Sequence, residues 1–279
     1  MSDDYLPTLR AHLGERFHLR GEIARGGMAR VYRADDLVRG GDVAIKVLRP
    51  DLAAAIGHSR FLREIRILGR LHHPNILPLL DSGEAGGGLY YVMPYIAGSS
   101  LQRRLAAEGP LPLGDAVNIS RGIAAALDHA HRHDVIHRDV KPGNVLLGEE
   151  RALVCDFGIA RAVELAGGEV LTASSGFAVG TPAYMSPEQA TGGTIDSRCD
   201  VYGLGCVLYE MLTGEPPFTG PTPQAILARS LAGEIRPVRT VRPDVPKPAE
   251  SAIRSALASD ADRRPRTAAD LMERFARGI

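Results

Sequence analysis

Two short polar segments, each set among apolar residues, carry the side chains best suited to chemistry in this sequence. The first is the run His137-Arg138-Asp139, with Lys141 and Asn144 two and five residues after the aspartate. The second is Asp156-Phe157-Gly158, which follows the apolar triplet Leu153-Val154-Cys155. Charged groups in an apolar neighbourhood are costly unless they are used, so both segments are candidates for a functional site.

These residue types meet the needs of phosphoryl transfer. That reaction requires a metal against the phosphates, a cation on the non-transferred phosphates and an oriented nucleophile. Asn144 and Asp156 offer oxygen ligands of the kind that magnesium prefers. Asp139 and Lys141 supply a carboxylate and a cation beside them.

Two earlier features complete the set, although each is weak alone. Residues 23–31 contain the turn Gly26-Gly27, and glycine lets a backbone approach phosphate oxygens closely. Lys46 lies in the β-rich run 43–48. A Gly-Gly turn is more often an ordinary hairpin connection, and a strand lysine is usually solvated. Only the four features together, in this order along the chain, indicate phosphoryl transfer.

A helix after the lysine strand carries a carboxylate on its buried face. Ser59 is a candidate cap for a helix running to about residue 71, and Phe61, Ile65 and Leu68 form its apolar stripe. Glu64 falls on that stripe and needs a cation, for which Lys46 is the candidate.

The remaining chain divides into a strand-rich part and a helix-rich part, with the boundary near 93–98. Pro94 lacks a backbone donor and marks a connector. Residues 162–179 are rich in Gly, Ser, Thr and Ala and read as a long loop, which in a compact domain is usually functional or mobile. Helices are predicted near residues 116–130, 201–212, 223–231, 249–257 and 268–277.

Composition excludes several classes of protein. The formal net charge is zero, so nothing indicates nucleic acid or an anionic membrane as the main partner. Three cysteines without a paired spacing argue against a disulfide framework or a zinc site and favour the cytosol. The N-terminus does not read as a signal peptide, and the longest apolar stretch is too interrupted to span a bilayer.

Taken together, the motifs resemble the protein kinase superfamily, and most closely its bacterial Hanks-type (eukaryotic-like) serine/threonine branch. Gly26–Ala29 with Val31-Tyr32, the run Ser186–Gln189 and the segment Gly214–Phe218 carry that likeness. The resemblance implies an α+β, bilobal kinase-like fold with a small antiparallel sheet lobe, one key helix, a larger helical lobe and an ATP cleft between them. The implied parts are an N-terminal extension (1–16), the N-lobe (17–93), the hinge (94–98) and the C-lobe (99–279).

The resemblance also implies a role for each matching residue. Asp139 would accept or orient the substrate hydroxyl proton, Lys141 would steady the γ-phosphate, and Lys46, paired with Glu64, would hold the α- and β-phosphates. Asn144 and Asp156 would bind Mg²⁺, with Mn²⁺ as an alternative. The other nucleotide contacts would be Ile23, Ala24, Gly26, Gly27, Val31, Ala44, Met93, Tyr95, Ile96 and Leu146. Outside the chemistry, Glu188 would pair with Arg264, and Leu68, Leu79, His137 and Phe157 would stack as a hydrophobic spine.

Three positions depart from the family pattern. Ala24 stands where the first glycine of the phosphate loop (24–31) is usual and is expected to stiffen that loop or weaken nucleotide affinity. Pro94 replaces a common acidic hinge residue but keeps its carbonyl for adenine. Tyr202 stands where a tryptophan is usual, which is a packing change.

Regulation by phosphorylation is also implied. Arg138, beside Asp139, is expected to lack a partner until a phosphate arrives on the loop that follows residue 158. The candidate acceptors are Thr172, Ser174 and Ser175, with Thr181 as a substrate-side contact. A merely flexible loop is the alternative.

Other interpretations stay open at this point. The chain could be a pseudokinase that binds nucleotide as a scaffold, or a small-molecule phosphotransferase with a kinase-like fold. The expected partners are protein substrates with Ser or Thr, and a second copy for trans-autophosphorylation. The expected location is the cytoplasm, either as a free protein or as part of a longer membrane-anchored receptor kinase. His129 and His133, one helical turn apart, are a weak candidate for a metal pair.

Overall fold

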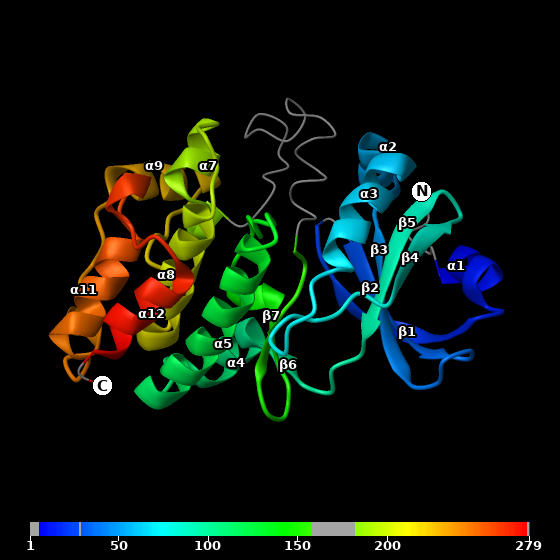
Figure 1. The fold of residues 1–279 in the computed structure, drawn as a ribbon, viewed down its shortest axis with the longest axis horizontal. Helices are drawn as coiled ribbons and strands as arrows, with labels where there is room; N and C mark the ends of the chain where they lie inside the picture. The colour runs from blue at the N-terminus through cyan, green and yellow to red at the C-terminus, as the bar shows by residue number, and fades with distance from the viewer. Residues whose placement is uncertain (1–5, 28, 158–181, 278) are drawn as a thin grey trace. The chain divides into compact units, whose positions relative to one another are not determined.

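The computed structural model describes residues 6–27, 29–157, 182–277 and 279, and for Ala55, Arg60 and Glu64 it describes the backbone only. The described chain divides into two compact units (Figure 1). The first comprises residues 6–72 and 77–97, and the second comprises residues 73–76, 98–157 and 182–279.

The first unit is built on a five-stranded antiparallel sheet in the order β1-β2-β3-β5-β4. The bounds of its strands are β1 Phe17–Arg25, β2 Ala29–Asp36, β3 Asp42–Leu48, β4 Asp81–Ala85 and β5 Gly88–Pro94. Alternation along these strands separates two faces, because successive side chains in a strand point to opposite sides. Strand β5 includes Pro94, which pairs with Val43, so the strand runs one residue into the predicted hinge.

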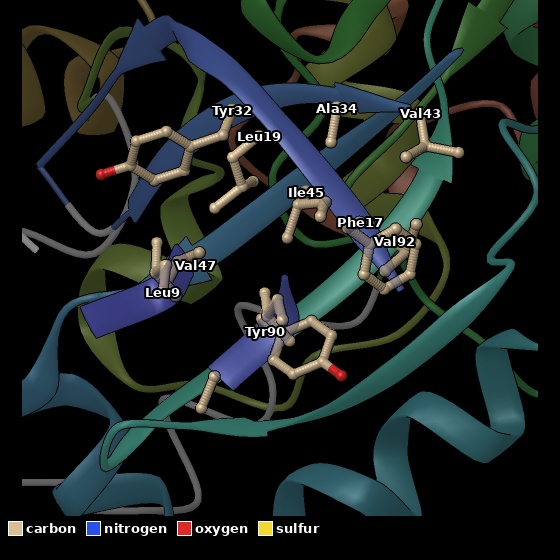
Figure 2. Packing of buried hydrophobic residues seen from close by; sticks show 12 residues of the cluster. Leu9, Phe17, Leu19, Tyr32, Ala34, Val43, Ile45, Val47, Tyr90 and Val92 are labelled. Atoms are coloured by element: carbon tan, nitrogen blue, oxygen red, sulfur yellow. The ribbon is translucent and has the colours of Figure 1, made fainter. Parts of the chain in front are cut away.

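One face of the sheet holds the unit's hydrophobic core. Figure 2 shows these side chains converging from the strands and from helix α1 (Leu6–Leu13). Leu9 and Leu13 of α1 are buried in the same cluster as the sheet residues, so this helix of the predicted N-terminal extension is part of the folded unit. The other members of the cluster are Phe17, Leu19, Tyr32, Ala34, Val43, Ile45, Val47, Ala85, Tyr90 and Val92.

The structure has two helices after β3, whereas only one was predicted, from Ser59 to about residue 71. Helix α2 spans Pro50–Ile56 and α3 spans His58–Leu68, and they are separated by Gly57 at a φ of 76°. That left-handed conformation suits glycine and interrupts the helix. The predicted cap at Ser59 is therefore wrong, because Gly57 occupies that position. Phe61 and Ile65 are buried, as the apolar stripe indicated.

The second unit surrounds a buried helix, α8 (Arg198–Thr213), in which every residue from Cys199 to Leu212 is buried. Helices α5 (Leu113–His131) and α11 (Lys247–Ala256) pack against it, and α12 (Ala268–Ala276) packs against both (Figure 1). A three-stranded sheet joins β6 (Ser99–Ser100), β7 (Val145–Leu147) and β8 (Ala152–Val154). The other elements are α4 Leu101–Glu108, η1 Pro142–Asn144, η3 Pro182–Tyr184, α7 Pro187–Thr191, α9 Pro223–Ala232, α10 Val238–Val241 and η4 Ala261–Arg263.

The helices predicted in this part of the chain are confirmed to within a few residues at each end. The predicted loop at 162–179 lies outside the described residues. Within the described part of the chain, no helix combines the length and apolar character needed to cross a bilayer.

Candidate active site

The segment between α5 and β7 carries the polar run of residues 137–144 and is held in place by Asp200. This aspartate lies in the first turn of α8 and is fully buried. Its carboxylate accepts the backbone N–H of His137 and of Arg138, both at 2.8 Å, and Nε2 of His131 at 2.7 Å. Arg138 has a φ of 67°, a conformation that costs a non-glycine residue energy and needs such bonds to persist.

The environment of Asp200 keeps it ionised. Burial opposes its charge, but the hydrogen bond and positive charge from His131, together with the His137 amide, hold the pKa of Asp200 below its usual value. The carboxylate is thus a fixed acceptor for the loop backbone.

His137 is a positioning side chain rather than an acid or base. Its Nε2 lies 2.9 Å from the carbonyl oxygen of Cys155, which can only accept, so Nε2 carries the proton. Its Nδ1 therefore accepts the backbone N–H of Asp139 at 3.1 Å. The ring packs against Phe157, and the two ring centroids lie 4.5 Å apart. His137 and Phe157 are the two members of the predicted spine that lie in this unit.

Asp139 presents one occupied and one open carboxylate oxygen. Its Oδ2 accepts Nζ of Lys141 at 2.7 Å and Nδ2 of Asn144 at 2.9 Å. Within the described part of the chain, no hydrogen bond reaches its Oδ1. The carboxylate is therefore held by two donors and retains an acceptor for a further hydroxyl group.

Asn144 and Asp156 fit a hard divalent cation. Nδ2 of Asn144 donates to both the carbonyl and the carboxylate of Asp139, and these acceptors fix the amide orientation. Its Oδ1 accepts no hydrogen bond from any described residue and is left as a ligand. The Cys155 N–H donates to the Asn144 carbonyl at 3.0 Å, which joins the residue before Asp156 to the segment that carries Asn144. An amide oxygen and a carboxylate are ligands suited to Mg²⁺.

Asn75, in the loop 73–76, holds strand β8, which precedes Asp156. The carbonyl of Asn75 accepts the Val154 N–H at 2.8 Å, and its side chain donates to the Ala152 carbonyl at 2.8 Å. Asp156 itself has a φ of 66°. As with Arg138, an unfavourable backbone conformation occurs at a predicted functional residue.

In the first unit, the sheet face opposite the hydrophobic core carries the predicted nucleotide residues. Val31 pairs with Lys46, and Ala44 pairs with Met93, so these four share that face. Nζ of Lys46 lies 5.9 Å from the centre of the Tyr91 ring. The predicted Lys46–Glu64 pair involves a side chain outside the described set.

The glycine turn is shorter than predicted. Ala24 belongs to β1 and pairs with Val31, so the loop expected over residues 24–31 is reduced to the few residues between the two strands. The pairing of β1 with β2 is irregular between Glu22 and Ala24, but Ala24 has no positive φ, so its backbone does not require glycine. Gly26 and Gly27 also lack a positive φ, and a Cβ would fit at either. The fold itself therefore does not require glycine at these two positions. Glycine there agrees with a ligand that approaches the backbone closely.

Tyr95 of the predicted hinge is held by contacts within the first unit. The backbone N–H of Tyr95 donates to the Asp42 carbonyl at 3.1 Å, and the Arg33 guanidinium lies 4.3 Å from the centre of the Tyr95 ring. That amide is therefore already used by the protein. Ile96, and Leu146 in the second unit, are partly buried, while Ile23 is exposed.

The regulatory residues are only partly described. The carbonyl of Arg138 accepts Nε2 of Gln189 at 2.8 Å, which fixes the backbone of this arginine. Arg138 also has other interaction partners in this structure, and a phosphate as the partner of its guanidinium stays a prediction. Thr172, Ser174, Ser175 and Thr181 lie outside the described residues.

A structural ion pair holds helix α7 against the rest of the second unit. Arg264 is fully buried and donates to both carboxylate oxygens of Glu188 at 2.7 Å, as the family resemblance implied. Its guanidinium also lies 4.9 Å from the centre of the Tyr202 ring. The Tyr202 hydroxyl bonds Ser230 at 2.7 Å, so the tyrosine in place of tryptophan gains a buried polar contact.

The weak metal hypothesis at His129 and His133 gains no support. Their rings stack 4.6 Å apart, and His129 also stacks on His73 at 5.1 Å. Across the described residues, no group of three His, Cys, Asp or Glu side chains is arranged to hold a metal ion.

Asp200, His131 and Asn75 are site-supporting residues that sequence reasoning missed. Asp200 stands at the start of the apolar stretch predicted as a buried helix. The reasoning applied to Glu64, that a buried carboxylate needs partners, would have found it.

Comparison with known proteins identifies the family of the chain. The model of the family "Protein kinase domain" matches residues 17–275. The chain is 42% identical over 270 residues to the serine/threonine-protein kinase PknB of Mycolicibacterium smegmatis, covering 95% of this chain and 43% of that protein. The chain thus spans less than half the length of that relative.

Two solved structures are also similar. The kinase domain of Mycobacterium tuberculosis PknI has a TM-score of 0.75 at 28% identity, covering 94% of this chain and 96% of that one. Rad53 1-466, solved in complex with AMP-PNP, has a TM-score of 0.76 at 26% identity, covering 95% and 66% respectively. The predicted α+β kinase-like fold class is confirmed. The chain belongs to the protein kinase domain family.

Proposed function

We propose that this chain is an ATP-dependent serine/threonine protein kinase that transfers the γ-phosphate of ATP to Ser and Thr hydroxyls of proteins. The observation that carries the proposal is Asp139, with Oδ2 held by Lys141 and Asn144 and Oδ1 open to a hydroxyl. The named similarity to serine/threonine-protein kinase PknB supports the substrate class.

Each residue of the loop has a part in this mechanism. Asp139 accepts a hydrogen bond from the substrate hydroxyl and orients its oxygen for attack. Lys141, bonded to Asp139 at 2.7 Å, brings a positive charge to the transferred phosphoryl group. Asn144 and Asp156 would hold Mg²⁺, which when bound supplies positive charge against the phosphate oxygens.

For the nucleotide, the supporting observations lie in the first unit. Lys46, Ala44, Val31 and Met93 share one sheet face, and Gly26 and Gly27 leave the turn between β1 and β2 open. The similar Rad53 structure contains AMP-PNP, an ATP analogue. We therefore propose ATP as the phosphate donor, with Lys46 on its non-transferred phosphates and Glu64 orienting Lys46. Since ATP is needed, the cytoplasm is the compartment in which we expect the reaction.

The decisive test replaces Asp139 by asparagine. Asp139→Asn keeps the size of the side chain but removes the carboxylate, and we expect transfer of radioactive γ-phosphate to a generic basic protein to fall by at least about a hundred-fold. Asp134→Asn is the matched control, because Asp134 is exposed and also has a positive φ of 58°, which asparagine tolerates. Equal activity of Asp139→Asn and wild type would overturn the assignment. Binding of nucleotide without transfer by the wild type would indicate a pseudokinase.

We also propose that a second copy phosphorylates the chain within residues 171–175. Mass spectrometry of protein incubated with ATP and magnesium should find phosphate on Thr172, Ser174 or Ser175. A variant with alanine at all three should lose activity that the wild type gains during this incubation. Full activity of the triple variant, with no phosphate found in the wild type, would contradict the proposal.

A further inference from the structure

Arg49 stands at the junction of β3 and α2, next to the glycine turn. Leu48, the last residue of β3, is buried and pairs with Ala29, the first residue of β2. Pro50 begins α2, and the Arg49 carbonyl accepts the Ala53 N–H at 2.8 Å as the first bond of that helix. The backbone of Arg49 is therefore fixed on both sides.

The Arg49 guanidinium is shared between an aspartate and the glycine turn. Its Nε donates to Oδ1 of Asp51 at 3.1 Å and its Nη2 donates to Oδ2 at 2.9 Å. This fork uses one edge of the planar group and aims the remaining nitrogen. Nη1 then donates to the carbonyl oxygen of Gly27 at 3.2 Å.

We propose that Arg49 is a positioning residue for the nucleotide phosphates, which it serves by holding the Gly27 carbonyl. This inference rests on the kinase activity proposed above. The turn is closed on its other side by the Gly26 N–H, which donates to the Ala29 carbonyl at 2.9 Å. A glycine pair has many accessible conformations, and ordering it on phosphate binding costs entropy. Arg49 lowers that cost by fixing one carbonyl in advance.

Electrostatics favour the same arrangement. A carbonyl oxygen carries partial negative charge and would repel phosphate oxygens if it turned toward them. Bonding the Gly27 carbonyl to a cation keeps that charge occupied. Arg49 and Asp51 have side chains 43% and 58% exposed, so their pair adds little to folding stability and its removal should mainly affect nucleotide affinity.

The test measures binding of AMP-PNP with magnesium by calorimetry, because this readout does not depend on phosphate transfer. Arg49→Ala should weaken AMP-PNP binding and raise the KM for ATP by about three- to ten-fold, the size of one lost hydrogen bond, while kcat stays within about two-fold. Arg49→Lys should behave similarly, since an ammonium group cannot fork Asp51 and still reach Gly27. The KM for the protein substrate should not change.

Arg20→Ala is the matched control. Arg20 pairs with Asp35 on the same sheet, through bonds of 3.0 and 2.7 Å, away from the turn. Unchanged AMP-PNP binding by Arg49→Ala, or an equal loss in Arg20→Ala, would overturn the inference. Weaker AMP-PNP binding by Arg49→Ala in a protein whose wild type transfers no phosphate would support Arg49 and reject the proposed activity. Melting curves show whether Arg49→Ala has unfolded. If it has, AMP-PNP binding by Arg49→Lys and Asp51→Asn replaces it as the test: weaker binding supports the inference, and unchanged binding overturns it.

Discussion

At the scale of single residues, the candidate site separates side chains that face a substrate from those that hold the backbone. Asp139, Lys141 and Asn144 form one bonded group around a carboxylate. His137 and Asp200 act on the polypeptide itself, through the Cys155 carbonyl and the loop amides. The polar residues of a single sequence run therefore have two different physical roles.

Another residue, the buried Glu210, allows a test of how its ionisation affects stability. Burial raises the pKa of Glu210, although a hydrogen bond from the Tyr184 hydroxyl, at 2.5 Å, partly opposes this. Burial also raises the pKa of Tyr184. An acid with a raised pKa binds more protons in the folded than in the unfolded state, so its contribution to stability falls as pH rises from about 4, where an unfolded glutamate titrates.

Glu210→Gln should remove this dependence while keeping an acceptor for Tyr184. We expect the free energy of unfolding of this variant, relative to wild type, to become larger as pH rises from about 4 to about 7, so the variant gains relative stability. Urea unfolding at a series of pH values measures the difference. A difference that is the same at every pH would show that Glu210 ionises in the folded protein as it does in the unfolded chain.

At the scale of elements, the loop that carries Asp139 packs closely against a glycine in the buried helix α8. A Cβ added to Gly203 would lie 2.8 Å from Cβ of Val140 and 3.0 Å from its carbonyl oxygen. Val140 directly follows Asp139, so a displacement of Val140 by a side chain on α8 would also move Asp139. Helix propensity alone would favour alanine by about 0.5–1 kcal/mol, but the clash outweighs it.

Gly203→Ala should therefore destabilise the protein by about 1–3 kcal/mol and lower kcat by about ten-fold or more. The matched control is Gly114→Ala in α5, where a Cβ meets nothing within 4 Å. That change should be neutral or slightly stabilising. Chemical denaturation and steady-state kinetics compare the two, and similar behaviour of both variants would remove the proposed link between α8 and the loop.

At the scale of the whole molecule, the folded unit begins before the segment that matches the kinase family. The match starts at residue 17, whereas α1 places Leu9, fully buried, in the core of the sheet. Leu9→Ala should cost about 2–5 kcal/mol of stability, as for other buried leucines. Arg10→Ala, on the exposed side of α1, should change stability by less than about 0.5 kcal/mol. Thermal unfolding of both variants and of a chain lacking residues 1–16 measures this. No loss of stability in the truncated chain would show that α1 contributes nothing to the core.

Local patterns in the sequence were sufficient for much of this protein. The β-rich run 43–48, the buried helix at 201–212 and the polar residues 137–144 between apolar runs are all visible in the chain, because burial and backbone geometry leave a trace in residue type. Two helices where one was expected, and the helix in residues 6–13, were missed. Gly57, with its positive φ, separates α2 from α3. Helix α1 is a short amphipathic segment whose stability comes from the sheet it covers.

What the sequence determined by itself was the set of groups that chemistry needs, since residue type and order identify Asp139, Lys141, Asn144 and Asp156. What only the tertiary structure decided was their geometry. Asp200, more than sixty residues after the loop, accepts two of its amides, and Arg49 reaches the turn at Gly27. Contacts of this kind join residues with no shared local pattern, and the distance between them becomes short only when the hydrophobic core of each unit has formed.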